Sequence, residues 1–305
     1  MTTGDEAGEW AVAETPTDAT LYAVVQTAAG PHAVGEDGVV LARRTDSPDD
    51  DGWRVVVEAG PGARRNTLRD AAVTAGGERV WFAGSSGALG AYDVAADRKH
   101  DHSAPMEKTS TWEAVAVAGP RDAESLRAAN GSGEVLPVAT DDDGCPEWGE
   151  VSEPGSGSSV AGLASDGRRF FVADTNGGAF EERGTDRTDI SPRNAEVDFH
   201  DVAASEATVR IAGDGGLVYR YDRVCRNWTP CRVGETALRA LAVDGDAALA
   251  VGAGGRAYRR TPTTGWRSVP TPVEESLRDV ALGGSGDAVG ETDVAVGESG
   301  VVIER

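Results

Sequence analysis

The sequence repeats one unit of four short apolar segments, and this repeat limits the possible folds more than any other feature. The clearest copy spans residues 237–272, where LRALAV, AALAVG, RAYRR and WRSV are separated by DGD, AGG and TPTTG. Short apolar segments between clusters of Gly, Asp, Thr and Pro are typical of β-strands joined by tight turns. The unit recurs along the chain with a period of about 39 to 49 residues, which indicates a repeat architecture.

The first segment of each unit follows one pattern, which is apolar, polar, small or acidic, and apolar. It occurs in seven places: 21–24, 68–71, 112–115, 160–163, 199–202, 238–241 and 277–280. The second segment of most units ends in an AVG-like step before a Gly-rich turn. A four-stranded unit cannot bury both of its faces alone, so each copy must pack against its neighbours. We therefore predict an all-β fold, a seven-bladed β-propeller of four-stranded antiparallel blades.

The two ends of the chain supply complementary parts of one unit. The sequence stops after the third segment of the seventh copy, while residues 8–16 resemble the fourth segment at 265–272. We expect residues 1–17 to close the ring as the last strand of the last blade, with Trp10 buried there. Closure would remove an open sheet edge, and residues 1–305 would form a single propeller domain. The alternative is an N-terminal tail without a fixed structure.

The net charge and the lysine content predict the kind of cell in which the protein works and the class of partner that it binds. The net charge is −22, and the basic residues include only two lysines, Lys99 and Lys108. Acidic residues spread over the whole chain with so few lysines indicate a halophilic cell, where concentrated salt screens their repulsion. A basic partner is the alternative explanation of the acidity. An overall basic footprint is lacking, which disfavours nucleic acid as a partner.

Targeting signals are lacking as well. No run of 18 apolar residues predicts a membrane span. The first residues are acidic and contain no apolar signal region. We expect a cytoplasmic protein that is a monomer by itself.

The sequence offers little support for a cofactor or a metal, and we predict neither. The cysteines are odd in number, which argues against a disulfide framework: Cys145, Cys225 and Cys231. Cys225 and Cys231 flank Trp228, so a disulfide or a metal site between them stays an alternative to free thiols. Asp runs at residues 46–51 and 141–143 suggest solvated loops, with Ca²⁺ binding as the alternative. The sequence holds no catalytic or nucleotide-binding signature such as GxSxG, HExxH or a P-loop.

A candidate binding site comes from the second residue of each first segment. In a propeller the first strand of every blade lines the central channel, so equivalent positions meet around one axis. These positions hold Tyr22, Arg69, Glu113, Ala161, His200, Arg239 and Arg278. Arginine presents a planar fork that suits carboxylate or phosphate. We predict that Tyr22, Arg69, Glu113, His200, Arg239 and Arg278 form a channel mouth that binds an acidic protein segment or a carboxylate ligand.

A structural role for the same arginines is the alternative. The next residue is an aspartate in three of the strands, at Asp70, Asp201 and Asp279. Neighbouring residues of a strand point to opposite faces. Each arginine could therefore pair with the aspartate of an adjacent blade and contribute only to stability.

The repeat, L-x-D-V-x-h followed by A-V-G-x-x-G and (G)-W-x-x-V, resembles that of BNR/Asp-box-type propellers. It is most similar to the family of photosystem II stability and assembly factors and their non-photosynthetic relatives. The Asp-box itself remains only in part, at residues 47–53. The resemblance covers nearly the whole chain and implies a seven-bladed, non-enzymatic scaffold that helps to assemble a larger complex. It also implies an arginine-rich patch, which we match to Arg69, Arg239 and Arg278.

Two functions therefore follow from the sequence. The first is a protein-binding scaffold, either a transient assembly factor or a permanent subunit. The alternative is a sialidase-like or lyase-like enzyme, because such propellers also carry Asp-boxes. A sialidase would require an arginine triad, a Tyr nucleophile with a Glu partner and an Asp acid. Tyr22, Glu113 and the three arginines supply parts of that set, but the sequence identifies no Asp acid.

Overall fold

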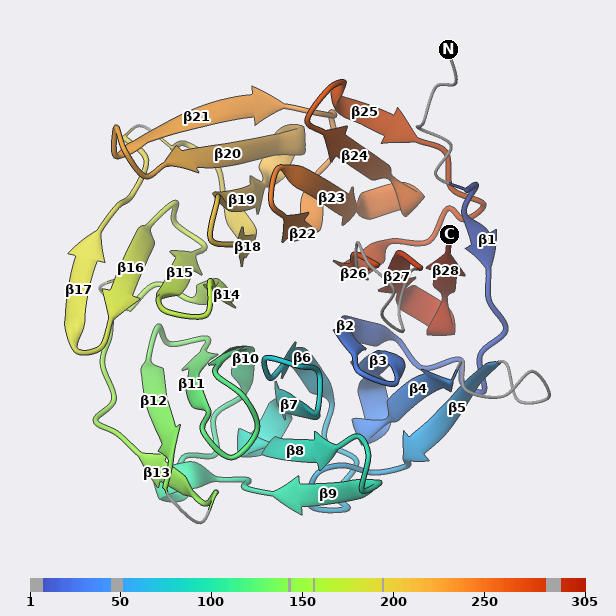
Figure 1. Cartoon of the computed structure of the whole chain (residues 1–305), viewed down its shortest axis with the longest axis vertical. Helices are drawn as coiled ribbons and strands as arrows, with labels where there is room; N and C mark the ends of the chain where they lie inside the picture. The colour runs from blue at the N-terminus through green and yellow to red at the C-terminus, as the bar shows by residue number, and fades with distance from the viewer. Residues whose placement is uncertain (1–7, 45–51, 142–143, 156, 194, 284–291) are drawn as a thin grey trace.

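The computed structural model describes residues 8–44, 52–141, 144–155, 157–193, 195–283 and 292–305. These residues form seven four-stranded antiparallel sheets that surround a central axis like the blades of a propeller (Figure 1). The prediction of an all-β, seven-bladed propeller is confirmed. Blade 1 begins at β2, and the chain then runs through blades 2 to 7 in order.

Each blade runs from the axis outward. The innermost strands are β2 (Leu21–Thr27), β6 (Leu68–Val73), β10 (Trp112–Ala118), β14 (Val160–Ser165), β18 (Phe199–Ala204), β22 (Leu238–Asp244) and β26 (Leu277–Ala281). The second strands are β3 (Gly30–Gly35), β7 (Arg79–Gly84), β11 (Ser125–Asn130), β15 (Phe170–Asp174), β19 (Val209–Gly213), β23 (Ala247–Gly252) and β27 (Val294–Gly297). The third strands are β4 (Val40–Arg44), β8 (Leu89–Asp93), β12 (Val135–Thr140), β16 (Ala179–Arg183), β20 (Leu217–Asp222), β24 (Ala257–Thr261) and β28 (Val302–Glu304). The outermost strands are β5 (Gly52–Val57), β9 (Arg98–Asp101), β13 (Pro146–Trp148), β17 (Asp186–Asp189), β21 (Asn227–Arg232), β25 (Gly265–Val269) and, in blade 7, β1 (Ala11–Val12).

The N-terminal strand closes the ring, as the sequence predicts. Strand β1 pairs antiparallel with β28, so the two ends of the chain lie in one blade (Figure 1). Trp10 is 5% exposed and packs in a core cluster with Leu249 of blade 6 and Ile303 of blade 7. The Arg305 guanidinium lies 5.0 Å from the centre of the Trp10 ring. Burial of so large a side chain holds a strand of only two residues in place.

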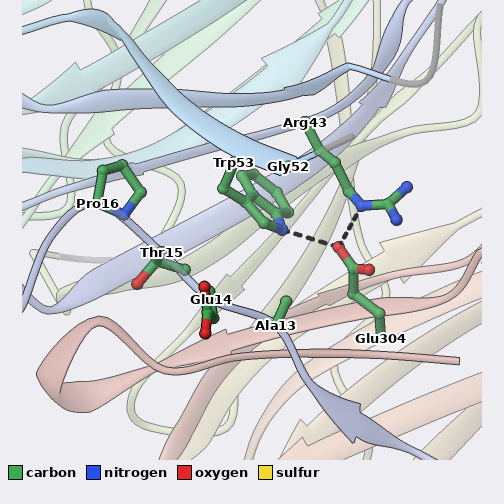
Figure 2. A pocket seen from close by; sticks show the side chains of 8 residues that line it. All are labelled: Ala13, Glu14, Thr15, Pro16, Arg43, Gly52, Trp53 and Glu304. Atoms are coloured by element: carbon green, nitrogen blue, oxygen red, sulfur yellow. Dashed lines mark hydrogen bonds and ion pairs between the residues drawn. The ribbon is translucent and has the colours of Figure 1, made fainter. Parts of the chain in front are cut away.

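Glu304 connects blade 7 with blade 1. Its Oε1 accepts a hydrogen bond of 2.8 Å from Trp53 Nε1 and lies 2.9 Å from Arg43 Nε (Figure 2). These side chains face a cavity of about 560 Å³, whose other wall is the segment 13–16 that follows β1. The boundary at which the ring closes is therefore polar at its rim and apolar inside, where Leu21 and Leu41 pack with Val296.

The hydrophobic core is divided among the boundaries between blades. Between blades 1 and 2, for example, Val40 and Val57 pack against Leu68, Phe82 and Tyr92. Each boundary buries one face of two sheets, as expected for a repeat unit that cannot bury both of its faces alone.

The turns between second and third strands explain the recurring glycines. Five of them are short 3₁₀ turns, at residues 36–38, 85–87, 214–216, 253–255 and 298–300. In the last of these, Ser299 and Gly300 both have positive φ, at 57° and 70°. A Cβ on Gly300 would lie 2.0 Å from the carbonyl oxygen of Thr17. The second left-handed residue must therefore be glycine, because the segment entering the next blade passes directly over it.

The weakest repeat segments also form strands. The fourth segments of blades 2 and 4 lack a tryptophan, yet they form β9 and β17. Strand β17 is exposed throughout and is held by pairing with β16. The Asp run at residues 46–51, which includes most of the Asp-box at 47–53, lies outside the described residues, as do Asp142 and Asp143.

Candidate binding site at the channel mouth

A β-bulge occurs at the same place in every innermost strand. In blade 2, Leu68 pairs with Gly84 and Asp70 pairs with Ala83, so Arg69 has no partner residue on β7. The same shift leaves the second residue of the innermost strand unpaired in the other six blades. A bulge bends the strand and redirects a side chain. The unpaired residues are Tyr22, Arg69, Glu113, Ala161, His200, Arg239 and Arg278.

The structure brings all six predicted site residues together. A cavity of about 110 Å³ at one end of the central channel is lined by Tyr22, Arg69, Glu113, His200, Arg239 and Arg278, with Ala161 in the same ring. We call this cavity the channel mouth. Asp70, Asp201 and Asp279 line it as well. Strict alternation along a strand would have separated Arg69 from Asp70, and the bulge is the reason that both face the same cavity.

Tyr22 lies close to two of the arginines of the channel mouth. The guanidinium carbons of Arg69 and Arg278 lie 5.0 and 5.9 Å from the centre of its ring. Tyr22 Oη donates a hydrogen bond of 3.3 Å to Glu36 Oε1. Arg278 Nη2 forms an ion pair of 2.6 Å with Glu298 Oε1 in its own blade. The Tyr22 ring therefore supports two cations, of which only Arg278 is neutralised within the described structure.

The remaining site residues differ in how far they are paired. His200 Nε2 lies 2.7 Å from Asp214 Oδ1, which fixes the orientation of the ring. Within the part of the chain that the structure describes, Arg69, Arg239 and Glu113 make no hydrogen bond or ion pair. Arg69 is exposed and Arg239 half-buried. Two guanidinium groups at the channel mouth are therefore available to an anion from outside.

The alternative, that these arginines pair with Asp70, Asp201 and Asp279, is not what the described residues show. Asp70 Oδ2 accepts a hydrogen bond of 2.7 Å from the backbone N–H of Val115 in the next blade. Its Oδ1 accepts one of 2.8 Å from the N–H of Ala71. Asp201 and Asp279 make the same two bonds, each with the following residue and with the next blade. The bulge exposes backbone donors beside each carboxylate, and these donors occupy both of its oxygens.

The three aspartates have unusual electrostatics because they share the low-dielectric interior of the channel. Burial raises the pKa of Asp70 to about 7 and that of Asp279 to about 6. Burial also raises the pKa of Asp201 well above its ordinary value, and the nearby Asp279 charge adds to this shift. The same carboxylates line a second cavity of about 260 Å³ further along the channel. The sequence showed that an aspartate recurs at this position in three blades, but it suggested these residues only as partners of the arginines and not as a ring of their own.

The structure also describes the cysteines and the arrangement of side chains that can bind a metal. Cys145, Cys225 and Cys231 are free and exposed thiols. Among the described residues, no group of three or more His, Cys, Asp and Glu side chains is arranged to hold a metal ion. In the same part of the chain, we find no helix with the length and apolar character needed to cross a membrane.

Comparison with known proteins places the fold. No protein-family model matches the sequence, and no curated protein sequence matches it either. Solved structures do match over nearly the whole chain. YCF48 from Cyanidioschyzon merolae is 14% identical, with 97% of this chain and 98% of that one covered and a TM-score of 0.70. A structure of YCF48 bound to D1 peptide is 11% identical, with coverages of 97% and 96% and a TM-score of 0.73.

Other solved structures match as well. The structure of U3-55K is 13% identical, with 99% of both chains covered and a TM-score of 0.76. At these identities the likeness is one of fold. The chain is thus a seven-bladed propeller whose fold resembles that of YCF48, of U3-55K and of a chain in the mitotic checkpoint complex.

Proposed function

We propose that this protein is a non-catalytic scaffold that binds another protein through the channel mouth, as an assembly factor or a subunit of a larger complex. The partner contributes an acidic segment or a terminal carboxylate. The observation that carries the proposal is a pair of arginines, Arg69 and Arg239, that make no ion pair with the described residues and lie at the mouth of a channel in a chain of net charge −22. Guanidinium groups that are not engaged in an ion pair attract an anionic group to this place.

The structural likeness supports the same function. One of the matching structures is YCF48 bound to D1 peptide, so a propeller of this shape accommodates a peptide. The arrangement of the channel mouth is compatible with a peptide carboxylate, because Arg69 lies over the Tyr22 ring and its guanidinium is held in place. A pre-oriented guanidinium loses little side-chain entropy when it binds.

The geometry favours binding over glycoside hydrolysis. A tyrosine nucleophile needs a lowered pKa, whereas burial and the neighbouring Glu36 raise the pKa of Tyr22. The Tyr22 hydroxyl donates its hydrogen bond to Glu36, and Glu113 makes none with it. The enzyme alternative therefore lacks an activated nucleophile among these residues.

Partner capture tests the proposal. The variant with Arg69, Arg239 and Arg278 all changed to Ala should lose capture of its partner from a native-salt lysate and keep the thermal midpoint of the parent. Each lost charge-assisted hydrogen bond costs about 1.5–3 kcal/mol of binding free energy. The corresponding triple Lys variant should regain only part of the capture, because Lys lacks the bidentate fork. A matched control changes three exposed arginines elsewhere, Arg64, Arg168 and Arg267, to Ala and should capture normally.

Two outcomes would contradict the proposal. If the triple Ala variant captures its partner as well as the parent does, the channel mouth is not the binding site. If instead it loses stability by several kcal/mol, the arginines serve the fold. Stable stoichiometric capture would identify a subunit, and transient capture an assembly factor.

A further inference from the structure

Arg210, on the second strand of blade 5, is a buried cation for which the described residues supply no hydrogen-bond acceptor at Nε or Nη2. Its side chain is 2% exposed. Burial, together with the charges of Arg260 and Arg220, lowers the pKa of Arg210 to about 10, so the group stays protonated at neutral pH. A buried charge of this kind is costly unless an opposite charge approaches it.

Blade 3 shows how the same position is satisfied elsewhere in the ring. Arg127 lies three residues before the end of β11, as Arg210 lies three residues before the end of β19. Arg127 Nε forms an ion pair of 2.9 Å with Glu182 Oε2 of blade 4. Its Nη1 donates 2.9 Å to the Leu126 carbonyl, and its guanidinium lies 4.4 Å from the centre of the Phe170 ring. The position is thus compatible with a buried arginine when the next blade supplies a carboxylate.

At Arg210 the next blade supplies an arginine in place of that carboxylate. Glu182 pairs across the sheet with Phe170, four residues before the end of β15. In blade 6 the equivalent second-strand residue is Ala248, four residues before the end of β23, and its cross-strand partner is Arg260. Arg260 therefore occupies in blade 6 the position that Glu182 occupies in blade 4. Arg220 is the cross-strand partner of Arg210 within blade 5. Three guanidinium groups therefore gather at the boundary between blades 5 and 6 of a strongly acidic protein.

The nearest carboxylate does not complete the site. Asp246 Oδ1 forms two long ion pairs, at 3.7 Å from Arg210 Nη2 and 3.6 Å from Arg260 Nη1. Both are beyond hydrogen-bonding distance, and the Asp246 side chain is 54% exposed, so water weakens them. Arg260 donates instead to the backbone carbonyl of Asp246. The position of Asp246 also shows that a solvent-exposed carboxylate can come close to Arg210. The site is therefore buried at Arg210 and open at Arg220, which is exposed.

We propose that Arg210, Arg260 and Arg220 form an anion site that binds a carboxylate group from outside the chain. The bound carboxylate takes the place that Glu182 has beside Arg127, where it accepts hydrogen bonds from Arg210 and Arg260. This site is independent of the channel mouth. Arg210 and Asp246 lie near the turn that joins β22 to β23, whereas Arg239 lies at the opposite end of β22.

Titration with acetate tests the site directly. Potassium acetate replaces potassium chloride at constant ionic strength, and ¹H–¹⁵N spectra record the arginine Nε–H signals of the folded protein. The Arg210 signal, identified by its loss in Arg210→Met, should shift saturably with acetate. Inorganic phosphate in a parallel titration should produce a smaller effect at equal concentration, because its larger tetrahedral shape does not match the planar position of Glu182. A phosphate response stronger than the acetate response would overturn the assignment to a carboxylate.

The variant Arg260→Glu tests the same inference without any ligand. It restores the arrangement of Arg127 with Glu182, so it should raise the melting temperature by a few degrees and abolish the acetate response of Arg210. The control Arg64→Glu makes the same charge change at an exposed position and should do neither. An Arg260→Glu variant that melts no higher than the parent and still responds to acetate would refute the site.

A second control distinguishes internal neutralisation. If Asp246 turns inward and occupies the site, the parent protein will show no acetate response and Asp246→Ala will acquire one. That result would also overturn the proposal, because the chain would then supply its own carboxylate.

Discussion

Asp279 Oδ2 accepts a hydrogen bond of 2.7 Å from the backbone N–H of Val24, a residue 255 positions away in sequence. This bond joins blade 7 to blade 1 beside the central axis. The other oxygen, Oδ1, accepts from the N–H of Val280 in the same strand. One carboxylate therefore fastens the bulge of its own blade and the inner edge of the next. Only a carboxylate offers two oxygens for this purpose, since an asparagine amide has one acceptor and one donor group.

The first prediction concerns pH. The folded-state pKa values of Asp279 and Asp70, about 6 and about 7, are above the ordinary value of an aspartate. Between about pH 4 and pH 7 the native state therefore holds protons that the unfolded state has released. The free energy of unfolding should therefore fall as pH rises through this window. Asp279→Asn should make the dependence of that free energy on pH less steep. Urea unfolding at fixed salt, from pH 4.5 to 7.5, measures the effect.

The absolute stability of Asp279→Asn does not decide this prediction, because the amide also loses one backbone hydrogen bond. The slope decides it. Arginine-paired carboxylates such as Asp93 and Asp166 have lowered pKa values, so they act in the opposite sense and only in more acidic solution. Equal slopes for the parent and Asp279→Asn would contradict the prediction.

The second prediction concerns closure of the ring. Deleting residues 1–16 removes β1 and the buried Trp10, exposes the edge of β28 and should lower the stability of the whole propeller. Trp10→Ala alone should cost about 3–5 kcal/mol, the usual range for a buried aromatic residue. Thermal denaturation at one salt concentration measures both, and deletion of residues 1–7 is the control. Parallel melting of the protein without residues 1–16 and the full-length protein would show that the ring does not need this strand. The same comparison tests whether residues 1–305 act as one domain.

The third prediction concerns Glu304. Its Oε1 is shared by Trp53 and Arg43 of blade 1, which are both largely buried beside it (Figure 2). Glu304→Leu leaves two donors without this acceptor and should cost about 1–3 kcal/mol. The control Glu274→Leu removes an exposed carboxylate and should change the free energy of unfolding by less than about 0.5 kcal/mol. A cost equal to that of the control would show that Glu304 contributes nothing to the boundary.

The fourth prediction concerns salt. With 51 acidic residues and 29 lysines and arginines, the chain repels itself at low ionic strength. Molar KCl shortens the screening length to about 3 Å, so it should stabilise the fold and dilution should destabilise it. Circular dichroism during dialysis to about 0.1 M salt follows this change. A native spectrum with an unchanged melting temperature after dialysis would remove the basis for a halophilic origin.

The sequence alone determined the architecture. The recurring apolar segments set the number of blades, and the likeness of residues 8–16 to residues 265–272 placed the closing strand. It also identified which residues would meet at the channel mouth, because equivalent positions of a closed ring necessarily face one axis. Such periodic information survives in a single sequence, since every unit must solve the same packing problem.

Only the tertiary structure decided which charges are neutralised. A bulge in each innermost strand places Arg69 and Asp70 around one cavity, and it assigns the carboxylate to backbone donors of the next blade. Arg127 and Arg210 occupy the same position on the second strands of blades 3 and 5, but the next blade places a glutamate beside Arg127 and an arginine beside Arg210. These differences depend on contacts between residues tens of positions apart and on the local break in alternation. The repeat pattern records neither, because it describes what the blades share and not how each pair of neighbours differs.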